Sequence, residues 1–318
     1  MKASRQTFKK FIKGALAIRD EGAYICPLTY EEEQIKMFIE VDPAGWGWRS
    51  QFSAGTRIEL KTDATELYFD YTSREFSSAD NTFDLYVDGV LQVVHKIEKP
   101  GFERVTYKMR EGWKLVQIYF PTDCRVGVKN FNINGAYKTV KDKGEKVLLI
   151  GDSITQGYGT FMSGAAYANV LQRKMGYNMI SQGIGGLPFK DCVLYKGEYV
   201  PDKIIIALGT NYYDAVDVYD YEKETVHFFK KLNELYGDKE IVYISPLWRD
   251  NDVDWDRFTW CIETATNEAL KYDNVTVIDG FDLVPHVHEC FCDKIHPNAY
   301  GSELYASNLA FVLKEIKF

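Results

Sequence analysis

The chain has 318 residues, and its 38 Lys and Arg against 46 Asp and Glu give a net charge of −8 with histidine neutral. An acidic chain without a long basic run lacks the positive patch that neutralises phosphates, so we expect no nucleic-acid partner. The hydrophobic content of 46% is enough for real cores, and the length corresponds to about two domains. No stretch approaches the roughly 20 consecutive apolar residues of a membrane span, so we expect no membrane partner either.

The cysteines and the first segment of the chain bear on its compartment. The six cysteines are scattered rather than arranged as a framework, which predicts reduced, mostly buried thiols. The segment 1–22 is interrupted by charged residues such as Lys9, Lys13 and Asp20, unlike a signal peptide. Both observations predict a cytoplasmic protein.

From about residue 37 to 134, short segments rich in β-branched and aromatic residues alternate with Gly, Asp, Asn and Pro. Asp88-Gly89 predicts a hairpin turn, because both residues tolerate positive φ angles. Several strands at this spacing predict an antiparallel, jelly-roll-like β-sandwich. The expected strands are 56–60, 66–71, 83–87, 91–95, 105–108 and 114–120.

The polar segment 137–146, which contains four lysines and a glycine, is interpreted as a linker. It predicts a β-sandwich accessory domain over residues 1–140 and a second domain over residues 141–318. In the second domain, apolar strands alternate with helical periodicity, which is typical of a parallel sheet covered by helices on both faces. The sequence therefore predicts a mixed α/β chain with a three-layer α/β/α C-terminal domain. Its expected strands are 147–150, 179–182, 203–208, 240–245 and 275–279, and its helices are 166–175, 221–236, 254–270 and 298–316.

The first strand of the parallel sheet runs into the sequence Gly-Asp-Ser-Ile-Thr-Gln-Gly at 151–157. Ser153 therefore stands at a strand-to-helix turn, where the N–H groups and positive end of the helix dipole face any anion that forms. Thr155 replaces the second glycine of Gly-x-Ser-x-Gly, which argues against the nucleophile elbow of α/β-hydrolases. The alternative is that Asp152 and Ser153 only cap a helix.

A serine hydroxyl needs a base, and the sequence Asp-Lys-Ile-His-Pro at 293–297 offers one. The carboxylate of Asp293 folds back to orient the imidazole of His296 if the intervening turn is tight. Pro297 disfavours helical geometry at His296, so the ring is expected on an extended tip before the final helix. The alternative is a surface histidine beside a helix start.

Two polar breaks at other strand ends supply candidate oxyanion donors. They are Gly-Ile-Gly-Gly at 183–186 and Gly-Thr-Asn at 209–211. Acyl transfer needs preorganised donors where the oxyanion develops, and glycine N–H groups and an asparagine amide are suitable. Either break, taken alone, is also an ordinary turn.

In the order Ser, Gly, Asn, then Asp and His, these four blocks resemble the SGNH hydrolases, also called the GDSL esterase/lipase family. The resemblance covers roughly residues 146–318. It implies that Ser153 is the nucleophile and first oxyanion donor, that His296 is the base, and that Asp293 is its partner. Ile154-Thr155 stand where the name-giving Leu-Ser would be, and this departure removes no catalytic atom.

The resemblance also implies that Gly186 and Asn211 complete the oxyanion hole. Gly186 is chosen because the glycine block of the family ends on the donor, and Gly183 and Gly185 are the alternatives. Tyr212 follows Asn211 where the family usually has Asp.

The predicted jelly roll ahead of this domain resembles the arrangement of family 2 carbohydrate esterases, which remove acetyl groups from sugars. The expected function is therefore a serine esterase for short acyl, above all acetyl, esters of carbohydrate. The expected partner is a small-molecule or oligosaccharide ester. The alternatives are a lysophospholipase or thioesterase with the same machinery, and a non-catalytic carbohydrate-binding protein.

Aromatic residues in loop-like contexts are candidates for stacking on a sugar ring. Trp248 and Tyr212 are the candidate substrate-binding residues. Trp46 and Trp48 are weaker candidates, and for each tryptophan the alternative is that it plugs the core or the domain interface.

The residues His286, His288, Cys290 and Cys292 alternate along a short segment and invite a zinc interpretation. The usual Cys-x-x-Cys spacings are missing, and the expected catalysis requires no metal. We therefore expect no metal and no other cofactor.

Overall fold

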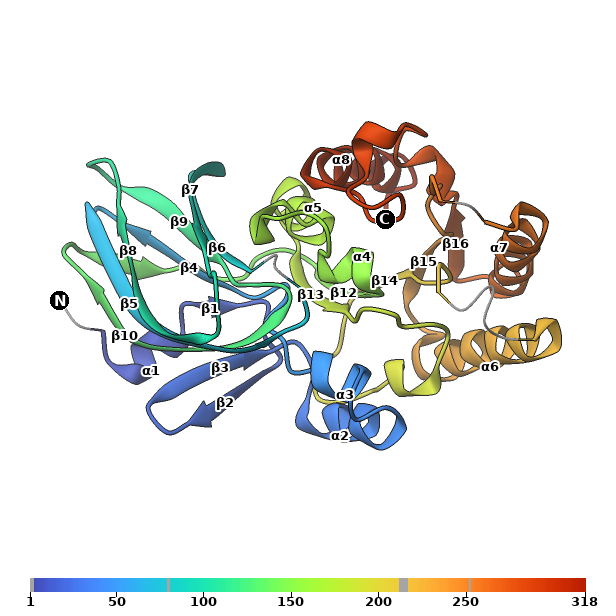
Figure 1. The fold of residues 1–318 in the computed structure, drawn as a ribbon, viewed down its shortest axis with the longest axis horizontal. Coiled ribbons are helices and arrows are strands. Elements are labelled where there is room, and N and C mark those ends of the chain that lie inside the picture. Colours follow the sequence, from blue (N-terminus) through green and yellow to red (C-terminus); the bar gives the residue numbers. More distant parts are fainter. Residues whose placement is uncertain (1–2, 79–80, 212–216, 252) are drawn as a thin grey trace.

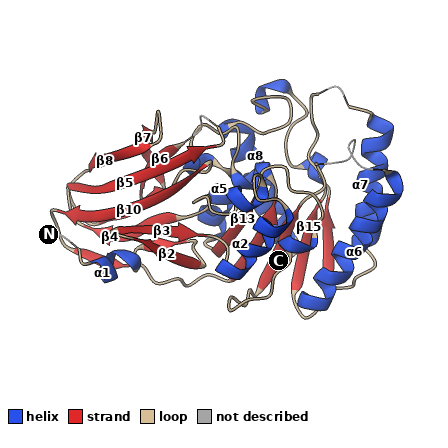
Figure 2. Ribbon diagram, turned by 60° about the horizontal axis from the view of Figure 1, so that its bottom comes forward, coloured by secondary structure: helices blue, strands red, loops and turns tan. Residues whose placement is uncertain are grey.

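The computed structural model describes residues 3–78, 81–211, 217–251 and 253–318. Two antiparallel sheets make up the N-terminal half, and a parallel sheet flanked by helices makes up the C-terminal half (Figures 1 and 2). The structure thus confirms the predicted mixed α/β fold with an antiparallel and a parallel part.

The antiparallel sheets enclose a core of buried apolar side chains, among them Leu60, Phe69, Phe83, Ile118 and Val126. One sheet has the order β1-β4-β9-β6-β7 with β11 beside β4, and the other has the order β2-β3-β10-β5-β8. The bounds are α1 Arg5–Lys9, β1 Ile12–Lys13, β2 Ala17–Glu21, β3 Tyr24–Leu28, β4 Arg57–Thr62, β5 Glu66–Phe76, β6 Thr82–Val87, β7 Val90–Lys96, β8 Gly101–Lys108, β9 Lys114–Tyr119, β10 Cys124–Ile133 and β11 Tyr137–Thr139.

Two local predictions can be compared with these strands. The hairpin at Asp88-Gly89 is confirmed, because β6 and β7 pair across it and the two residues have φ angles of 50° and 80°. The segment 137–146 is not linker throughout, because Tyr137–Thr139 form β11 and pair with β4. This difference arises because Tyr137 packs against an apolar side chain of the sandwich: the ring of Phe11 lies edge-on to it, with the ring centroids 5.3 Å apart. The division near residue 140 stays a prediction.

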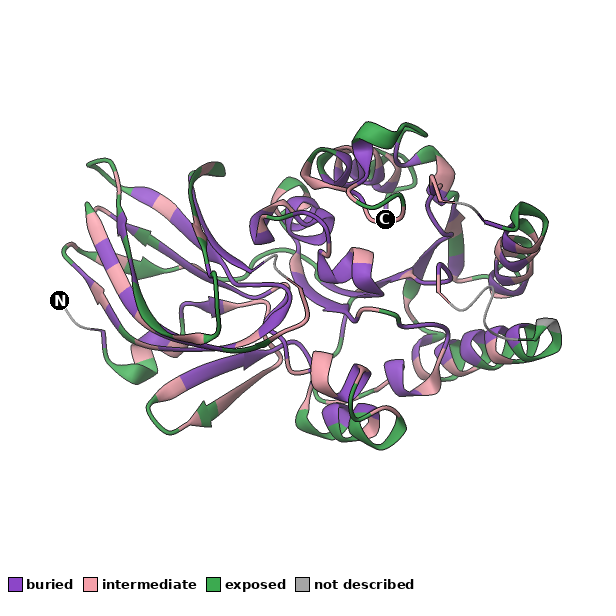
Figure 3. Ribbon diagram, viewed as in Figure 1, coloured by how far each residue is buried: buried purple, intermediate pink, exposed green. Residues whose placement is uncertain are grey.

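The parallel sheet has the order β13-β12-β14-β15-β16. Successive side chains along each strand point to opposite faces of the sheet. On β12, Leu148 and Ile150 belong to the core under α6 and α7, whereas Val147 and Leu149 belong to the core under α5 and α8. Helices therefore cover both faces, and their buried residues lie on the helix sides that face the sheet (Figure 3). The bounds are β12 Lys146–Gly151, α4 Ser153–Gln156, η1 Ser163–Ala165, α5 Tyr167–Met175, β13 Asn178–Gly183, η2 Asp191–Val193, β14 Lys203–Ala207, α6 Val218–Tyr236, β15 Glu240–Ile244, α7 Trp255–Ala269, β16 Val275–Ile278, η3 Gly280–Asp282, η4 His288–Cys290 and α8 Ala299–Glu315.

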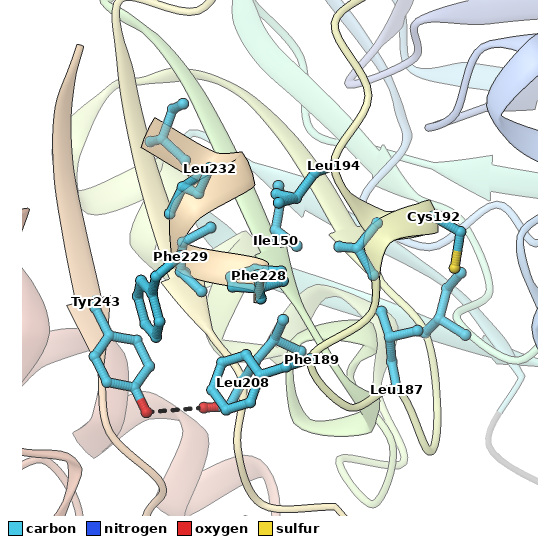
Figure 4. Packing of buried hydrophobic residues seen from close by; sticks show 14 of the residues in the cluster. Ile150, Leu187, Phe189, Cys192, Leu194, Leu208, Phe228, Phe229, Leu232 and Tyr243 are labelled. Atoms are coloured by element: carbon cyan, nitrogen blue, oxygen red, sulfur yellow. Dashed lines mark hydrogen bonds between the residues drawn. The ribbon is translucent and has the colours of Figure 1, made fainter. Parts of the chain in front are cut away.

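Phe189, Phe228, Phe229 and Tyr243 pack together in the core on the α6 side (Figure 4). The Tyr243 hydroxyl donates a hydrogen bond of 3.4 Å to the carbonyl of Leu208, so the polar end of this buried ring is satisfied. This core fixes the carboxyl end of β14, from which the chain enters the Gly-Thr-Asn segment.

A segment from the N-terminal half completes this core. The connection from β13 to β14 contains only the short η2, and helices α2 (Glu32–Val41) and α3 (Trp46–Arg49) occupy the space beside it. Phe38 and Trp46 are buried in the same cluster as Ile150. Gln34 also donates a hydrogen bond of 3.0 Å to the carbonyl of Val193. The sequence predicted β structure from about residue 37 onward. This prediction was wrong for the end of α2 and for α3, which are helical.

The described residues include no helix that is long and apolar enough to cross a membrane. All six cysteines lie in the described part of the chain, and none of them forms a disulfide there. Five of the six are buried, as the sequence predicted.

If α2 belongs to the core of the parallel sheet, Phe38→Ala should lower the free energy of unfolding by about 3–5 kcal/mol. Phe38 is fully buried and packs edge-on against Tyr30 at 5.2 Å. Val41→Ala in the same helix is the matched control, because Val41 is 57% exposed, and its cost should stay within about 0.5 kcal/mol. Urea unfolding followed by tryptophan fluorescence measures both, and equal costs would contradict the placement of α2.

Candidate active site

Ser153 is the first residue of α4, directly after β12. Asp152 caps this helix, because its Oδ1 accepts a hydrogen bond of 2.9 Å from the N–H of Ile154. The N–H of Ser153 itself has no acceptor within the helix, since the first N–H groups of any helix lack one. The side chain of Ser153 is buried except for the face that lines a cavity of about 520 Å³.

His296 and Asp293 complete a hydrogen-bonded chain that begins at Ser153. The Oγ of Ser153 lies 2.8 Å from Nε2 of His296, and Nδ1 of His296 lies 2.8 Å from Oδ2 of Asp293. The turn between the two residues is tight, with Lys294 at φ 71°. Oδ1 of Asp293 accepts hydrogen bonds from the backbone N–H groups of His296 (2.9 Å) and Ile295 (3.2 Å). The structure thus brings together three side chains that the sequence predicted as one group.

The ionisation of this pair follows from its surroundings. Burial lowers the pKa of His296 below the ordinary 6.5, and the charge and hydrogen bond of Asp293 offset this only in part. Burial tends to raise the pKa of Asp293, but hydrogen bonds from His296 and the backbone outweigh it and lower the pKa of this carboxyl. The imidazole is therefore neutral at pH 7, as a base must be.

The three glycines of the segment 183–186 differ in their contacts. A Cβ on Gly183 would lie 2.2 Å from the backbone N of Gln156, so only glycine lets β13 approach α4 this closely. The N–H of Gly185 donates a hydrogen bond of 2.7 Å to Oε1 of Gln156. Gly186 has a φ of 77°, lines the cavity and has open space where a Cβ would stand. Among the three, Gly186 is the candidate whose N–H has no acceptor in the described part of the chain.

Asn211 also lines the cavity, and two hydrogen bonds orient its side-chain amide. Its Nδ2 donates to the carbonyl of Leu187 at 3.2 Å and to Oδ2 of Asp152 at 3.4 Å. Burial raises the pKa of Asp152 to about 7, because the ionised carboxyl is poorly solvated there. Asp152 therefore connects the cap of α4 to the orientation of Asn211.

Both halves of the chain line the cavity. The C-terminal half contributes Ser153, Gln156, Tyr158, Gly185, Gly186, Thr210, Asn211, Arg249, Asn251, Ile295 and His296, and the N-terminal half contributes Arg49, Ser77 and Asp123. Most of these side chains are polar, and the ring of Tyr158 lies 4.6 Å from that of His296. The cavity therefore suits a polar ligand rather than a long apolar chain.

Trp248, one of the two candidate substrate-binding residues, is not among the described residues that line this cavity. Trp248 is half-buried and stacks on His286 at 5.2 Å, with Phe291 edge-on at 5.5 Å, so it packs in the core under α8. Tyr212 lies outside the described residues. Of the other tryptophans, Trp46 is buried in the core, and Nε1 of Trp48 donates a hydrogen bond of 2.7 Å to Glu75.

The segment that invited a zinc interpretation has other contacts. Nε2 of His286 lies 2.9 Å from the carbonyl of Phe281, and Nδ1 of His288 lies 2.8 Å from Oδ2 of Asp250. The described residues contain no group of three or more His, Cys, Asp or Glu side chains placed to hold a metal ion.

Sequence reasoning missed Gln156, Arg249 and the three residues that come from the N-terminal half. Gln156 carried a signal, because it lies one helical turn after Ser153 and so shares its surroundings. Arg49 and Asp123 carried none, since only the tertiary fold brings them to the carboxyl end of the parallel sheet.

Residues 149–304 match the model of the GDSL-like lipase/acylhydrolase family. No curated protein sequence matches the chain. Several solved structures share its fold. A salicylyl-acyltransferase from a tetracycline biosynthetic pathway superposes with a TM-score of 0.74 at 19% identity, over 96% of this chain and 94% of that one.

Two carbohydrate esterases have the same two-part arrangement. The acetyl xylan esterase Est2A of Butyrivibrio proteoclasticus gives a TM-score of 0.62 at 19% identity, over 84% of this chain and 91% of its own. A family two carbohydrate esterase of Clostridium thermocellum, solved with cellohexaose, gives 0.65 at 18% identity, over 84% and 93%. At these identities the likeness shows the shared fold.

The hydrogen-bonded chain predicts how His296 titrates. Its pKa should lie below 6.5, and Asp293→Asn should lower it further, because the carboxylate of Asp293 favours the charged ring. Titration of ¹⁵N-labelled histidine side chains by NMR measures the pKa directly. His95 is the internal control, because its pKa is lowered by burial in the sandwich and should not respond to the substitution. A rise in the pKa of His296 in Asp293→Asn would contradict the geometry.

Proposed function

Because residues 149–304 match the model of the GDSL-like lipase/acylhydrolase family, we propose that the chain is a serine esterase for short acyl, above all acetyl, esters of carbohydrate. The observation that carries the proposal is the continuous hydrogen-bonded chain from Ser153 through His296 to Asp293, which opens on a cavity. A serine is a nucleophile only beside such a base.

In the proposed reaction, Oγ of Ser153 attacks the ester carbonyl while Nε2 of His296 takes its proton. The imidazolium that forms is stabilised by Asp293, and it then protonates the departing alcohol. The N–H groups of Ser153 and Gly186 donate to the oxyanion, and the amide of Asn211 joins them when one of its N–H groups turns away from its 3.4 Å contact with Asp152. Water activated by His296 then releases the acid and restores Ser153.

The polar lining of the cavity supports a carbohydrate rather than a lipid substrate. Thr210 and Asn251 offer hydroxyl and amide groups of the kind that bind sugar hydroxyls, and the aliphatic side chain of Ile295 lies in the same lining. Two proteins with this fold, an acetyl xylan esterase and a family two carbohydrate esterase solved with cellohexaose, support this class of substrate.

The first test is hydrolysis of 4-nitrophenyl esters from acetate to decanoate. The rate should be highest at acetate, and Ser153→Ala and His296→Ala should each lower kcat by more than about 10³-fold. His288→Ala is the matched control, because His288 also faces an aspartate but is exposed and does not line the cavity, so its rate should equal that of the wild type. Release of acetate from acetylated xylan tests the carbohydrate part.

A rate that peaks at long acyl chains would contradict the short-chain part and favour a lysophospholipase or thioesterase. Absence of any Ser153-dependent hydrolysis would contradict the esterase itself and favour a non-catalytic carbohydrate-binding protein.

The role of Asn211 has its own test. Asn211→Ala should lower kcat by roughly 10²- to 10³-fold, equivalent to about 3–4 kcal/mol of lost transition-state stabilisation, with little change in KM. Asn308→Ala is the control. It removes an amide on α8 that donates a hydrogen bond to the carbonyl of Leu283, and it should not change kcat. Steady-state kinetics with 4-nitrophenyl acetate measures both, and an Asn211→Ala variant within twofold of the wild type would refute the role.

A further inference from the structure

Arg49 lines the catalytic cavity, and the mechanism above does not use it. It is the last residue of α3 and is half-buried. Its Cδ and Nε lie 3.6 Å from the position that a Cβ would take on Gly185, so the side chain runs along the glycine loop beside the proposed oxyanion donor, Gly186. A positive charge therefore stands next to the place where the ester would bind.

The guanidinium of Arg49 makes no hydrogen bond or ion pair with any residue in the described part of the chain, and its carbon Cζ lies 5.7 Å from the centroid of the Trp48 ring. The other charged residues of the cavity are engaged. Arg249 donates to the carbonyl of Thr210 at 2.8 Å, and Asp123 accepts hydrogen bonds from Gln156 and Ser78. A half-buried guanidinium without an anion has donors left for a ligand.

The backbone that carries Arg49 is held in place before any ligand binds. The carboxylate of Asp42 accepts hydrogen bonds from the N–H groups of Gly45 (3.0 Å) and Trp46 (3.1 Å), which holds the start of α3. Trp46 is buried in the same core as Ile150, at the end of the strand that leads to Ser153. A donor anchored in this way loses little entropy when it binds.

Resting on the proposed function, we propose that the substrate carries a carboxylate beside the scissile ester and that Arg49 binds it as a specificity-determining residue. A guanidinium is planar, and two of its N–H groups can donate parallel hydrogen bonds to the two oxygens of a carboxylate. Among the described residues, the lining contains two guanidinium groups, of Arg49 and Arg249, and one carboxyl group, of Asp123, so this part of the lining has an excess of positive charge that an anion would balance. Asp123 would repel a phosphate dianion more than it repels a carboxylate, which favours the carboxylate.

The test compares two pairs of esters that differ only in a carboxylate. The mono-4-nitrophenyl ester of succinate and its methyl ester place the charge on the acyl side, and 3-carboxyphenyl acetate and its methyl ester place it on the alcohol side. In at least one pair, wild-type kcat/KM should favour the carboxylate, and Arg49→Gln should lower that preference by roughly 10- to 100-fold. Rates with Ser153→Ala give the background to subtract.

Two further variants separate binding from structure. Arg49→Lys keeps the charge but loses the fork, so it should retain part of the preference. Arg110→Gln removes an exposed arginine that pairs with Asp88 on the sandwich, and it should leave the preference unchanged. Equal losses on both members of a pair in Arg49→Gln would indicate a structural role and overturn the proposal.

Absence of a carboxylate preference in both wild-type pairs, with Ser153-dependent hydrolysis intact, would overturn this proposal alone. Absence of Ser153-dependent hydrolysis of all four esters would instead overturn the proposed function. Calorimetric binding of benzoate against benzamide, in wild type and Arg49→Gln, then still measures the carboxylate site, and equal binding of the two would overturn it.

Discussion

The side-chain amide of Gln156 joins the two halves of the molecule at the catalytic cavity. Its Nε2 donates to the carboxylate of Asp123 and, at 3.1 Å, to the carbonyl of Thr122, and its Oε1 accepts from the N–H of Gly185. The amide is buried, so a lost partner would leave a polar group unsatisfied at a cost of about 1–3 kcal/mol. Because Gly185 is engaged in this way, the neighbouring N–H of Gly186 is the one left to face the cavity. The geometry of the glycine loop therefore depends on a loop of the sandwich.

The same dependence extends to the core of the parallel sheet. The short connection between β13 and β14 leaves one face of the sheet to be covered by α2 and α3, which belong to the N-terminal half. Burial of Phe38 and Trp46 there makes the two halves share a core, and it also carries Arg49 to the cavity. The sandwich is thus part of the wall of the candidate active site, which gives it a direct means of selecting the substrate.

Burial has different consequences for the ionisable groups behind the cavity, because their hydrogen bonds differ. Asp152 receives few hydrogen bonds, and burial raises its pKa to about 7. Asp293 is buried less but receives backbone hydrogen bonds and faces His296, so its pKa falls. The result is a neutral imidazole held by an ionised carboxylate, which is the combination that general-base catalysis requires.

The sequence by itself determined the two kinds of sheet and pointed to Ser153, Asp293 and His296 as one candidate catalytic group. Strand periodicity is a local property, and both the turn after β12 and the turn at 293–296 are short enough for local chemistry to define them. Only the tertiary structure decided which glycine faces the cavity, placed Trp248 in the core instead of the lining, and brought Arg49 to the site. Each of these outcomes depends on burial and on contacts between separate segments of the chain, such as Gln156 with Gly185, Trp248 with His286 and Arg49 with Gly185, and neither periodicity nor motif spacing contains that information.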